Sequence, residues 1–370
     1  MNTKIALTQI AAMRTVNDII DPERNNFTLI RIIAAFAVVL SHGMELKTGD
    51  AANAILARVA YYNLGDLAVN VFFVLSGLMV SASLDRSRSH KRFIVSRLLR
   101  IFPGLIFCTV VLALFAGPLL STLSARQYFE GREVLDFIIK TLLTLSGSST
   151  LPGVFAEPSL QASVNSPVWT LKYELACYFV LVALSAAGIF NRRRVLLWLT
   201  LISWLAILLY FVWLPDGRLS TVGAQISRFW LCFSAGMLAY QFRQSVPISI
   251  AWAVIAAALL LVSLHTTAER FVGPLAAGYL SLWLGVAPTG PLRLLANEYD
   301  LSYGAYIFGW PITQALVRAW PTAGIGETLI AACILSALAA IMSWLLIERP
   351  AMRFGRFKMN KNPDSPAVRA

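Results

Sequence analysis

The chain has 370 residues, of which 58% are hydrophobic and only 14% are charged. A soluble domain carries about 25% charged residues, so this composition excludes an ordinary soluble protein and predicts a membrane-embedded helical bundle. The net charge of +12 does not indicate nucleic-acid binding, because Lys and Arg collect in short loops between apolar runs, the pattern of cytoplasmic loops in membrane proteins.

Apolar runs long enough to cross a membrane, about 20 residues each, follow one another along most of the chain. They predict an all-α polytopic bundle of about ten transmembrane helices. The expected spans are 27–44, 64–82, 101–120, 168–190, 195–214, 222–240, 248–265, 270–287, 301–319 and 325–347. Residues 1–26 are mixed and polar, which predicts a cytoplasmic N-terminal segment and no cleaved signal peptide. A single transmembrane domain at 27–348 and a basic cytoplasmic tail at 349–370 complete the expected organisation.

Three basic clusters set the expected orientation. They follow the second, fourth and tenth spans and are formed by Arg86, Arg88, Lys91, Arg92, Arg97 and Arg100, by Arg192, Arg193 and Arg194, and by Arg349, Arg353, Arg356 and Lys358. Ten spans with both termini in the cytoplasm place all three clusters inside, as the positive-inside rule requires.

The short apolar segment 134–146 is expected to lie along the outer membrane surface. Asp136, Lys140 and Thr144 recur every four residues and form one polar stripe, which is typical of an interfacial helix. The following segment, 147–167, is rich in Ser, Pro and Gly and is expected to be an outer loop over the bundle.

Two ionisable residues of the first span, Arg31 and His42, are the first candidates for a site, because charged groups inside spans are costly and mark function. They lie eleven residues apart, about 16 Å along a helix and close to three full turns, so they share one face. An imidazole can act as a general base on a hydroxyl. The alternatives are a structural histidine and an arginine that extends to the cytoplasmic headgroups.

Glu174 in the fourth span and Ser76 in the second are the next candidates. Glu174 lies near the depth expected for His42, and a buried carboxylate needs a partner, so it can orient the imidazole or pair with Arg31. Ser76 and Gly77 form a small pair that favours close helix packing and leaves room for a thin ligand. No G-x-S-x-G sequence surrounds Ser76, which argues against a serine nucleophile.

Arg97 and Arg100 stand three residues apart at the cytoplasmic entrance of the third span, where guanidinium groups suit phosphate; topogenic charge is the alternative. Tyr303 and Tyr306 lie near the inner end of the ninth span, and the alternative for both is an ordinary aromatic residue of the membrane interface. Pro311 in the same span predicts a kink that frees a backbone carbonyl. At the cytoplasmic end of the last span, Glu348 is expected to pair with an arginine.

No metal site or disulfide is expected. The four cysteines lie inside apolar runs and lack CxxC spacing; they are Cys108, Cys177, Cys232 and Cys333.

Taken together, these residues resemble the acyltransferase family 3 membrane proteins over roughly residues 25–350. Arg31 and His42 resemble the family's arginine–histidine pattern in the first span. The segments VFFVLSG, RLLRIFP, SPVWTLKYE, LSYGAY and the closing ERP resemble its later motifs, in the family's order. The W-x-L-x-x-E part falls on Trp169, Leu171 and Glu174.

The resemblance implies transfer of an acyl group, usually acetyl, from acyl-CoA to a carbohydrate hydroxyl at the outer side of a bacterial inner membrane. It implies that Arg31 and His42 are essential and that Arg97 and Arg100 lie near the CoA phosphates.

The mechanism that we expect from these residues places Ser76, Tyr303 and Tyr306 along the donor arm. His42, oriented by Glu174, then acts as the base, and Arg31 or a nearby donor stabilises the oxyanion. The expected partners are acetyl-CoA as a donor substrate, a sugar or lipid-linked oligosaccharide, and membrane lipids. No permanently bound cofactor or metal is implied, and no oligomeric state is favoured.

One departure limits the resemblance, and one alternative function stays open. Many relatives carry a histidine before the Trp-Pro pair of the ninth span, where this chain has Gly309. An alternative function, transport or flipping of a lipid-linked sugar without acyl transfer, would also suit ten spans with buried charges, although such proteins normally show two similar halves.

Overall fold

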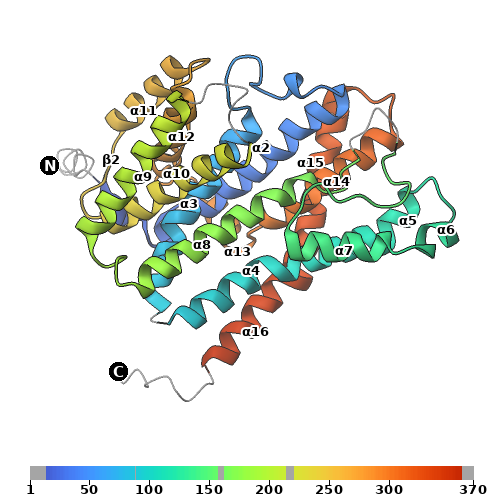
Figure 1. The fold of residues 1–370 in the computed structure, drawn as a ribbon, viewed down its shortest axis with the longest axis horizontal. Coiled ribbons are helices and arrows are strands. Elements are labelled where there is room, and N and C mark those ends of the chain that lie inside the picture. Colours follow the sequence, from blue (N-terminus) through green and yellow to red (C-terminus); the bar gives the residue numbers. More distant parts are fainter. Residues whose placement is uncertain (1–13, 88, 157–161, 214–220, 361–370) are drawn as a thin grey trace.

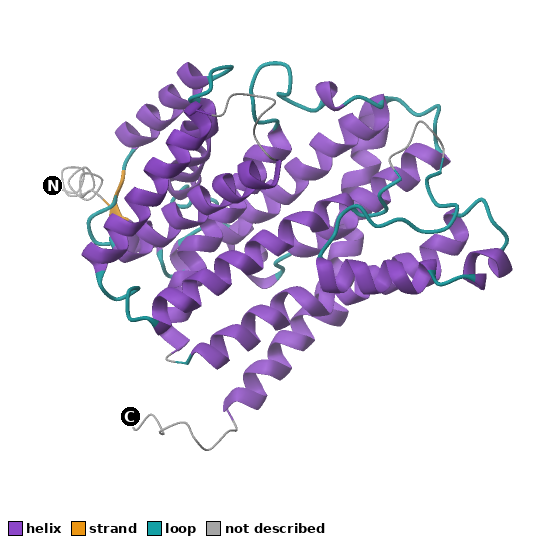
Figure 2. Ribbon diagram, viewed as in Figure 1, coloured by secondary structure: helices purple, strands orange, loops and turns teal. Residues whose placement is uncertain are grey.

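The computed structural model describes residues 14–87, 89–156, 162–213 and 221–360, and it is almost entirely helical (Figure 2). The longer helices form one bundle (Figure 1). They are α2 (Phe27–Thr48), α3 (Leu64–Ser87), α4 (His90–Val111), α8 (Leu171–Ala186), α9 (Arg193–Trp213), α10 (Thr221–Gln241), α11 (Ile250–Ser263), α12 (Glu269–Leu284), α14 (Ser302–Ala319), α15 (Ile325–Ser343) and α16 (Arg349–Asn360).

Shorter elements connect these helices. They are β1 (Arg14–Thr15), η1 (Val16–Ile19), η2 (Pro22–Arg24), η3 (Ala51–Asn53), the π-helical turn η4 (Leu112–Ala116), α5 (Gly117–Leu120), α6 (Ala125–Glu130), α7 (Glu133–Thr144), η5 (Ser166–Thr170), β2 (Pro247–Ile248), α13 (Pro291–Glu298) and the π-helical turn η6 (Trp344–Glu348). β1 pairs antiparallel with β2, so the described part of the N-terminal segment packs on the bundle. The rest of that segment (1–13), residues 157–161 of the outer loop and residues 361–370 of the tail lie outside the described residues.

A helix forms at each of the ten expected spans, and the all-α membrane fold is confirmed. Within the described residues, six helices are long and apolar enough to cross a membrane: Phe27–Thr48, Leu64–Ser87, His90–Leu120, Ser166–Ala186, Arg193–Trp213 and Ile325–Gly355. The count of ten therefore stays a prediction. Large apolar side chains face outward along α9, where Trp198, Ile202 and Leu205 are all more than half exposed; an apolar outer surface of this kind suits lipid.

Helix α14 is less apolar than the six candidate spans because it occupies the middle of the bundle. Every residue from Ser302 to Pro311 is buried. The helix packs against α2 and α15, so it faces protein on most sides and can carry polar groups that a lipid-facing helix could not satisfy.

Glycines bring α3 and α10 into backbone contact. A Cβ on Gly77 would lie 2.0 Å from the Phe233 carbonyl oxygen, and one on Gly236 would lie 2.0 Å from the Val74 carbonyl oxygen. Any larger side chain would separate the two helices. The packing interpretation of Gly77 is confirmed, and this contact turns the neighbouring Ser76 toward the interior of the bundle.

The carbonyl that Pro311 frees is satisfied from outside its own helix. Pro311 has no N–H for the carbonyl of Ile307, four residues earlier. The Asn165 side-chain amide donates to that oxygen at 2.9 Å, and the Cys108 thiol donates to it at 3.4 Å. This fastens the outer loop, α4 and α14 together at one point.

Helix α7 has the expected amphipathic form. Asp136, Lys140 and Thr144 are exposed, and Val134, Phe137 and Thr141 on the other side are buried. The apolar residues Leu135, Ile139 and Leu143 are also exposed, next to the polar stripe. A surface that joins apolar and polar stripes suits a membrane boundary, so the interfacial placement of this helix stays a prediction.

Candidate active site

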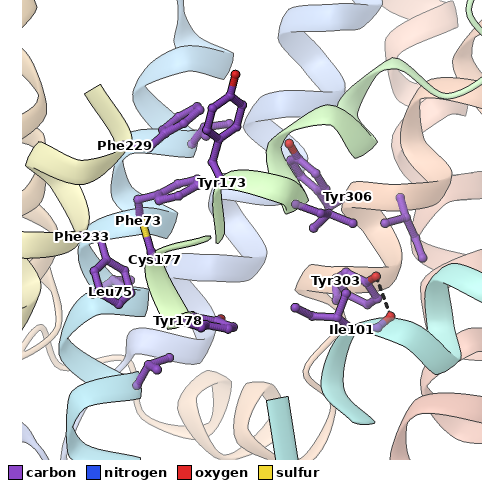
Figure 3. Packing of buried hydrophobic residues seen from close by; sticks show 14 of the residues in the cluster. Phe73, Leu75, Ile101, Tyr173, Cys177, Tyr178, Phe229, Phe233, Tyr303 and Tyr306 are labelled. Atoms are coloured by element: carbon purple, nitrogen blue, oxygen red, sulfur yellow. Dashed lines mark hydrogen bonds between the residues drawn. The ribbon is translucent and has the colours of Figure 1, made fainter. Parts of the chain in front are cut away.

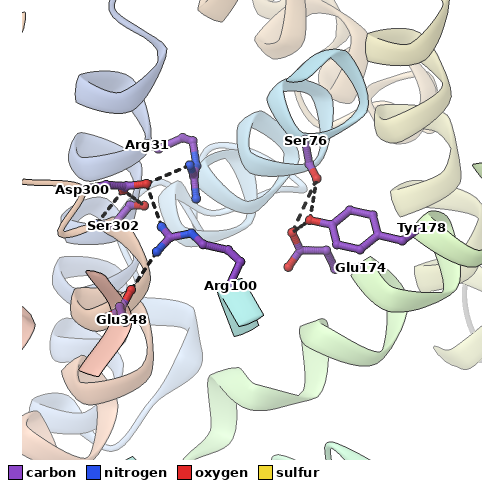
Figure 4. Close-up of polar contacts among 8 residues, drawn as sticks. All are labelled: Arg31, Ser76, Arg100, Glu174, Tyr178, Asp300, Ser302 and Glu348. Atoms are coloured by element: carbon purple, nitrogen blue, oxygen red, sulfur yellow. Dashed lines mark hydrogen bonds and ion pairs between the residues drawn. The ribbon is translucent and has the colours of Figure 1, made fainter. Parts of the chain in front are cut away.

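The inner end of the bundle, defined here as the end where Arg31 lies, contains a closed network of ion pairs (Figure 4). Asp300, between α13 and α14, accepts from Arg31 at 3.2 Å and from Arg100 at 2.7 Å. Arg100 also bonds Glu348 at 2.7 Å, and Ser343 donates to Glu348 at 2.8 Å. The network joins α2, α4, α14 and the end of α15. The expected pairing of Glu348 with an arginine is confirmed.

Arg100 is the centre of this network. Its side chain is 14% exposed, and its guanidinium lies 5.6 Å from the Tyr303 ring and 5.7 Å from the Trp344 ring. Burial on its own would raise the pKa of the Asp300 carboxyl, but Arg100 and Arg31 together lower it to about 2. Both carboxylates hold Arg100 in place, so its role toward an external phosphate stays a prediction.

Arg97, one turn earlier on α4, has a different environment. Its guanidinium contacts the Ser96 hydroxyl at 3.4 Å and lies 5.9 Å from the Phe93 ring. Within the described residues it makes no ion pair. A guanidinium in this setting can accept an anionic ligand without first giving up a carboxylate.

A cavity of about 100 Å³ extends from the ion network into the bundle. It lies between α2, α3, α4, the start of α8 and α14. Seven of the eight candidate residues line it: Arg31, Ser76, Arg97, Arg100, Glu174, Tyr303 and Tyr306. The grouping of these residues, which come from five helices, is what the motifs could not show by themselves.

Opposite the ion network, Glu174 forms a second polar group with Ser76 and Tyr178 (Figure 4). The Tyr178 hydroxyl donates to Glu174. The Ser76 hydroxyl lies 3.4 Å from the Glu174 carboxylate and 3.2 Å from the Tyr178 hydroxyl. The expected partners of Glu174, His42 or Arg31, are wrong, because its bonds go to these two hydroxyls and Arg31 bonds Asp300.

The two tyrosines of α14 present their rings to the cavity and use their hydroxyls elsewhere (Figure 3). Tyr303 donates to the Ile101 carbonyl at 2.7 Å. Tyr306 lies 2.8 Å from the Thr170 hydroxyl and donates to the Pro167 carbonyl at 3.1 Å. These hydroxyls hold α14 against α4 and η5, and they leave the rings as the apolar lining of the cavity.

His42 is not part of the cavity lining. It lies toward the outer end of α2, where its side chain is 31% exposed and its Nδ1 is 3.3 Å from Glu45 Oε2. The Trp310 ring meets the imidazole edge-on, with the ring centroids 4.9 Å apart. Glu45, three residues along the same helix, therefore takes the orienting position that was expected for Glu174.

The distance between His42 and the cavity follows from the helix register. Gly65 of α3 packs on Ser41, and Gly309 of α14 packs on Val39. Counting inward from these contacts places Val69 and Tyr306, at the outer end of the cavity, level with residues 36–37 of α2. His42 is five to six residues further out, or about 8 Å along the axis, and Arg31 is about as far inward.

Gly309 stands where many relatives are expected to carry a histidine, and the structure explains why this chain has none. A Cβ there would lie 2.4 Å from the Val39 side chain. Close contact between α14 and α2 therefore excludes a second imidazole at this position without repacking.

Sequence reasoning missed Glu45, Tyr178 and Asp300. Glu45 and Tyr178 follow His42 and Glu174 at helical spacings of three and four residues, so a search of the same helix face would have found them. Asp300 carried a weaker signal, an acidic residue just before the LSYGAY segment, and only the fold brings it to Arg31 and Arg100.

The fold and the site define a multi-pass helical membrane protein whose internal cavity is charged at one end. Residues 24–348 match the acyltransferase domain family, and the chain belongs to that family. The resemblance drawn from the motifs is confirmed, and the protein is an acyltransferase.

Three relatives match over most of their length. The O-acetyl transferase of Shigella phage Sf6 is 24% identical, over 88% of this chain and 95% of the relative. Nodulation protein 10 of Rhizobium leguminosarum bv. viciae is 28% identical, over 89% and 94%. The exopolysaccharide production protein ExoZ of Rhizobium meliloti is 27% identical, over 80% and 92%. No solved structure matches the chain.

Proposed function

We propose that this protein is an O-acyltransferase of the bacterial inner membrane. It moves acetyl from cytoplasmic acetyl-CoA to a hydroxyl of a carbohydrate at the outer side of the membrane. The carbohydrate is an exopolysaccharide, an O-antigen or a lipid-linked sugar. Family membership supports the reaction class, and the names of the relatives support acetyl and a surface glycan. The observation that carries the proposal is the cavity, which begins at three arginines and ends below the level of His42.

The donor is oriented by charge. Arg97 binds a CoA phosphate, because it lines the cavity and makes no ion pair within the described residues. Arg31 and Arg100, held by Asp300 and Glu348, keep the inner end positive and fix its shape. The pantetheine arm then lies between the Ser76–Glu174–Tyr178 group and the tyrosine rings, with the acyl group leading toward the outer end.

The acceptor is activated at His42. Its Nδ1 donates to Glu45, which leaves Nε2 to take the proton of the acceptor hydroxyl. The hydroxyl oxygen attacks the thioester carbonyl, the C–S bond breaks, and the CoA thiolate leaves and takes up a proton. Direct transfer accounts for the reaction with one histidine, and no acyl-histidine intermediate is required.

Donor and acceptor must meet across the remaining 8 Å of helix. Tyr306, Thr170 and Phe72 form the wall at that level, with Phe72 meeting the Tyr306 ring edge-on at 5.9 Å between centroids. Transfer therefore requires this wall to move when both substrates are bound. The arrangement protects the thioester from outer water before the acceptor arrives.

A direct test uses the purified full chain in detergent, labelled acetyl-CoA, and surface polysaccharide from cells that lack the protein. We expect the wild type to transfer label and His42→Ala to lose about 10²–10⁴-fold of the rate. His90→Ala is the matched control, because His90 bonds Ser185 far from the cavity lining and should keep full activity.

Two results would contradict the proposal. Wild-type rates in His42→Ala would remove the base role. An intact thioester in the wild type, with every glycan fraction tested, would favour the alternative of a transporter or flippase for a lipid-linked sugar.

A further inference from the structure

The lining of the cavity changes in character along its length, and the change follows the helix register. At the inner end are the guanidinium groups of Arg31, Arg97 and Arg100. The middle carries the Ser76–Glu174–Tyr178 group. The outer end is formed by Val69, Phe72, Phe73, Thr170, Leu171 and Tyr306.

Among the described residues, the lining of the outer end includes no cation and no unpaired hydroxyl. Arg228, which acts electrostatically on Tyr306 from behind this lining, is already bound by Asp66. Its polar atoms are the hydroxyls of Thr170 and Tyr306, which lie 2.8 Å from each other, and each also donates to the Pro167 carbonyl. Everything else at this end is an aliphatic or aromatic side chain. A carboxylate placed here would lose its hydration and gain no cation from the lining.

The walls of this end are close-packed in the structure, which corresponds to the state before the wall at Tyr306 moves. Phe73 stacks on Phe229 with the ring centroids 4.2 Å apart, and Phe72 packs edge-on against Tyr306. Leu171 is 3% exposed and Val69 is 9% exposed. Close-packed side chains of this kind resist an additional methylene, because inserting one forces neighbours off their rotamers.

On the proposed orientation of the donor, the acyl group occupies this outer end. We propose that Val69, Phe72 and Leu171 select the acyl group of the donor, so that a short uncharged acyl such as acetyl is accepted and longer or carboxylate-bearing acyl groups such as butyryl and succinyl are rejected. This inference rests on the proposed function and adds the chemical class of the donor to it.

Two valines of α3 give a matched test. Val69 lines the outer end of the cavity and Val80 lines the inner end, so Val69→Ala and Val80→Ala remove the same atoms from opposite ends of one cavity. Each purified variant is given acetyl-, propionyl-, butyryl- and succinyl-CoA, and the relative kcat/KM values are measured with the same acceptor.

We expect the wild type to prefer acetyl-CoA over butyryl-CoA by at least about tenfold, since one or two methylenes in an apolar pocket are worth that much. Val69→Ala should raise the butyryl-to-acetyl ratio by about tenfold, and Val80→Ala should leave it unchanged. Succinyl-CoA should stay a poor donor in all three proteins, because the space created by Val69→Ala contains no cation.

Equal shifts in the two variants, or no shift in Val69→Ala, would overturn the inference. Val69→Leu is the second variant, in case the smaller side chain destabilises the bundle: it should reduce propionyl transfer more than acetyl transfer, and an equal reduction would also count against the selector role. Absence of transfer from every acyl-CoA by the wild type would instead refute the proposed function, so the two failures are distinguishable.

Discussion

The two ends of helix α2 place their ionisable residues in opposite kinds of environment. Arg31 belongs to a network in which two carboxylates pair with two guanidinium groups, and the side chain of its partner Asp300 is 15% exposed. His42 lies beside the carboxylate of Glu45, and its side chain is 31% exposed. The inner residue is held by an ion pair, and the outer one is partly exposed. A shared helix face therefore does not imply a shared cavity.

Two arginines of helix α4 also lie in different environments. Arg100 is bonded to Asp300 and Glu348, and Arg97, one turn away, makes no ion pair within the described residues. If the inner network is structural and Arg97 binds a ligand, substitution of Arg100 should reduce stability. Substitution of Arg97 should instead reduce donor binding.

The largest effect is expected from Arg100→Ala. The substitution leaves Glu348, which is 2% exposed, with Ser343 as its remaining bond among those described, and removes the shorter of the two ion pairs of Asp300. Breaking a buried pair in this way costs about 3–5 kcal/mol, measured as the free energy of unfolding in detergent. Arg97→Ala is the control and should cost less than about 1 kcal/mol.

The stability that comes from the ion pairs of Asp300 should be constant across the neutral range of pH. Because the pKa of Asp300 is lowered to about 2, its ion pairs contribute fully above the ordinary carboxyl pKa of about 3.9. That stability is lost only as the pH falls through the lowered value. Asp300→Asn tests this directly: a loss of stability relative to the wild type that varied between pH 5 and 8 would contradict this account.

A smaller effect is expected from Arg97→Gln, on donor affinity. A charge-assisted hydrogen bond to phosphate is worth about 1.5–3 kcal/mol, so the Kd for CoA should rise about 10–100-fold. The Kd for a pantetheine thioester, which has no phosphate, should not change. Equal weakening toward both ligands would place Arg97 on the pantetheine arm and not at the phosphates.

The smallest effect is expected from Glu45→Gln, which keeps a hydrogen-bonding side chain beside His42 and removes its charge. The rate at saturating donor should fall about tenfold, and the KM for acetyl-CoA should stay constant because Glu45 is outside the cavity lining. Asp50→Asn on the same outer surface is the control, since its carboxylate caps Ala52. An increase in the KM for acetyl-CoA without a fall in rate would place Glu45 on the donor side. That result would contradict its assignment beside His42.

Several elements of the fold could be predicted because their signals are local. Apolar runs specify helices, the charged-polar stripe of Asp136, Lys140 and Thr144 specifies an exposed helix face, and Pro311 specifies a freed carbonyl wherever the helix is placed. The lower hydropathy of α14 had no local explanation, because it reflects burial among other helices.

Partner choice was beyond the reach of the sequence at Glu174. Its depth in the membrane is readable from its span and favours His42 as the partner, with Arg31 as a second choice. Rotation of α8 decides the matter: it turns the carboxylate toward Ser76 on α3, while Tyr178, one turn along the same helix, supplies the second bond.

The sequence by itself determined the membrane class, the acyltransferase family and seven of the residues that line one cavity, because hydropathy and motif order are properties of neighbouring residues. Only the tertiary structure decided that Asp300 closes the inner network, that Glu45 accompanies His42, and that His42 stands about 8 Å beyond the cavity. These outcomes depend on the register between helices that are distant in the chain, and that register is set by close contacts such as those of Gly65 and Gly309.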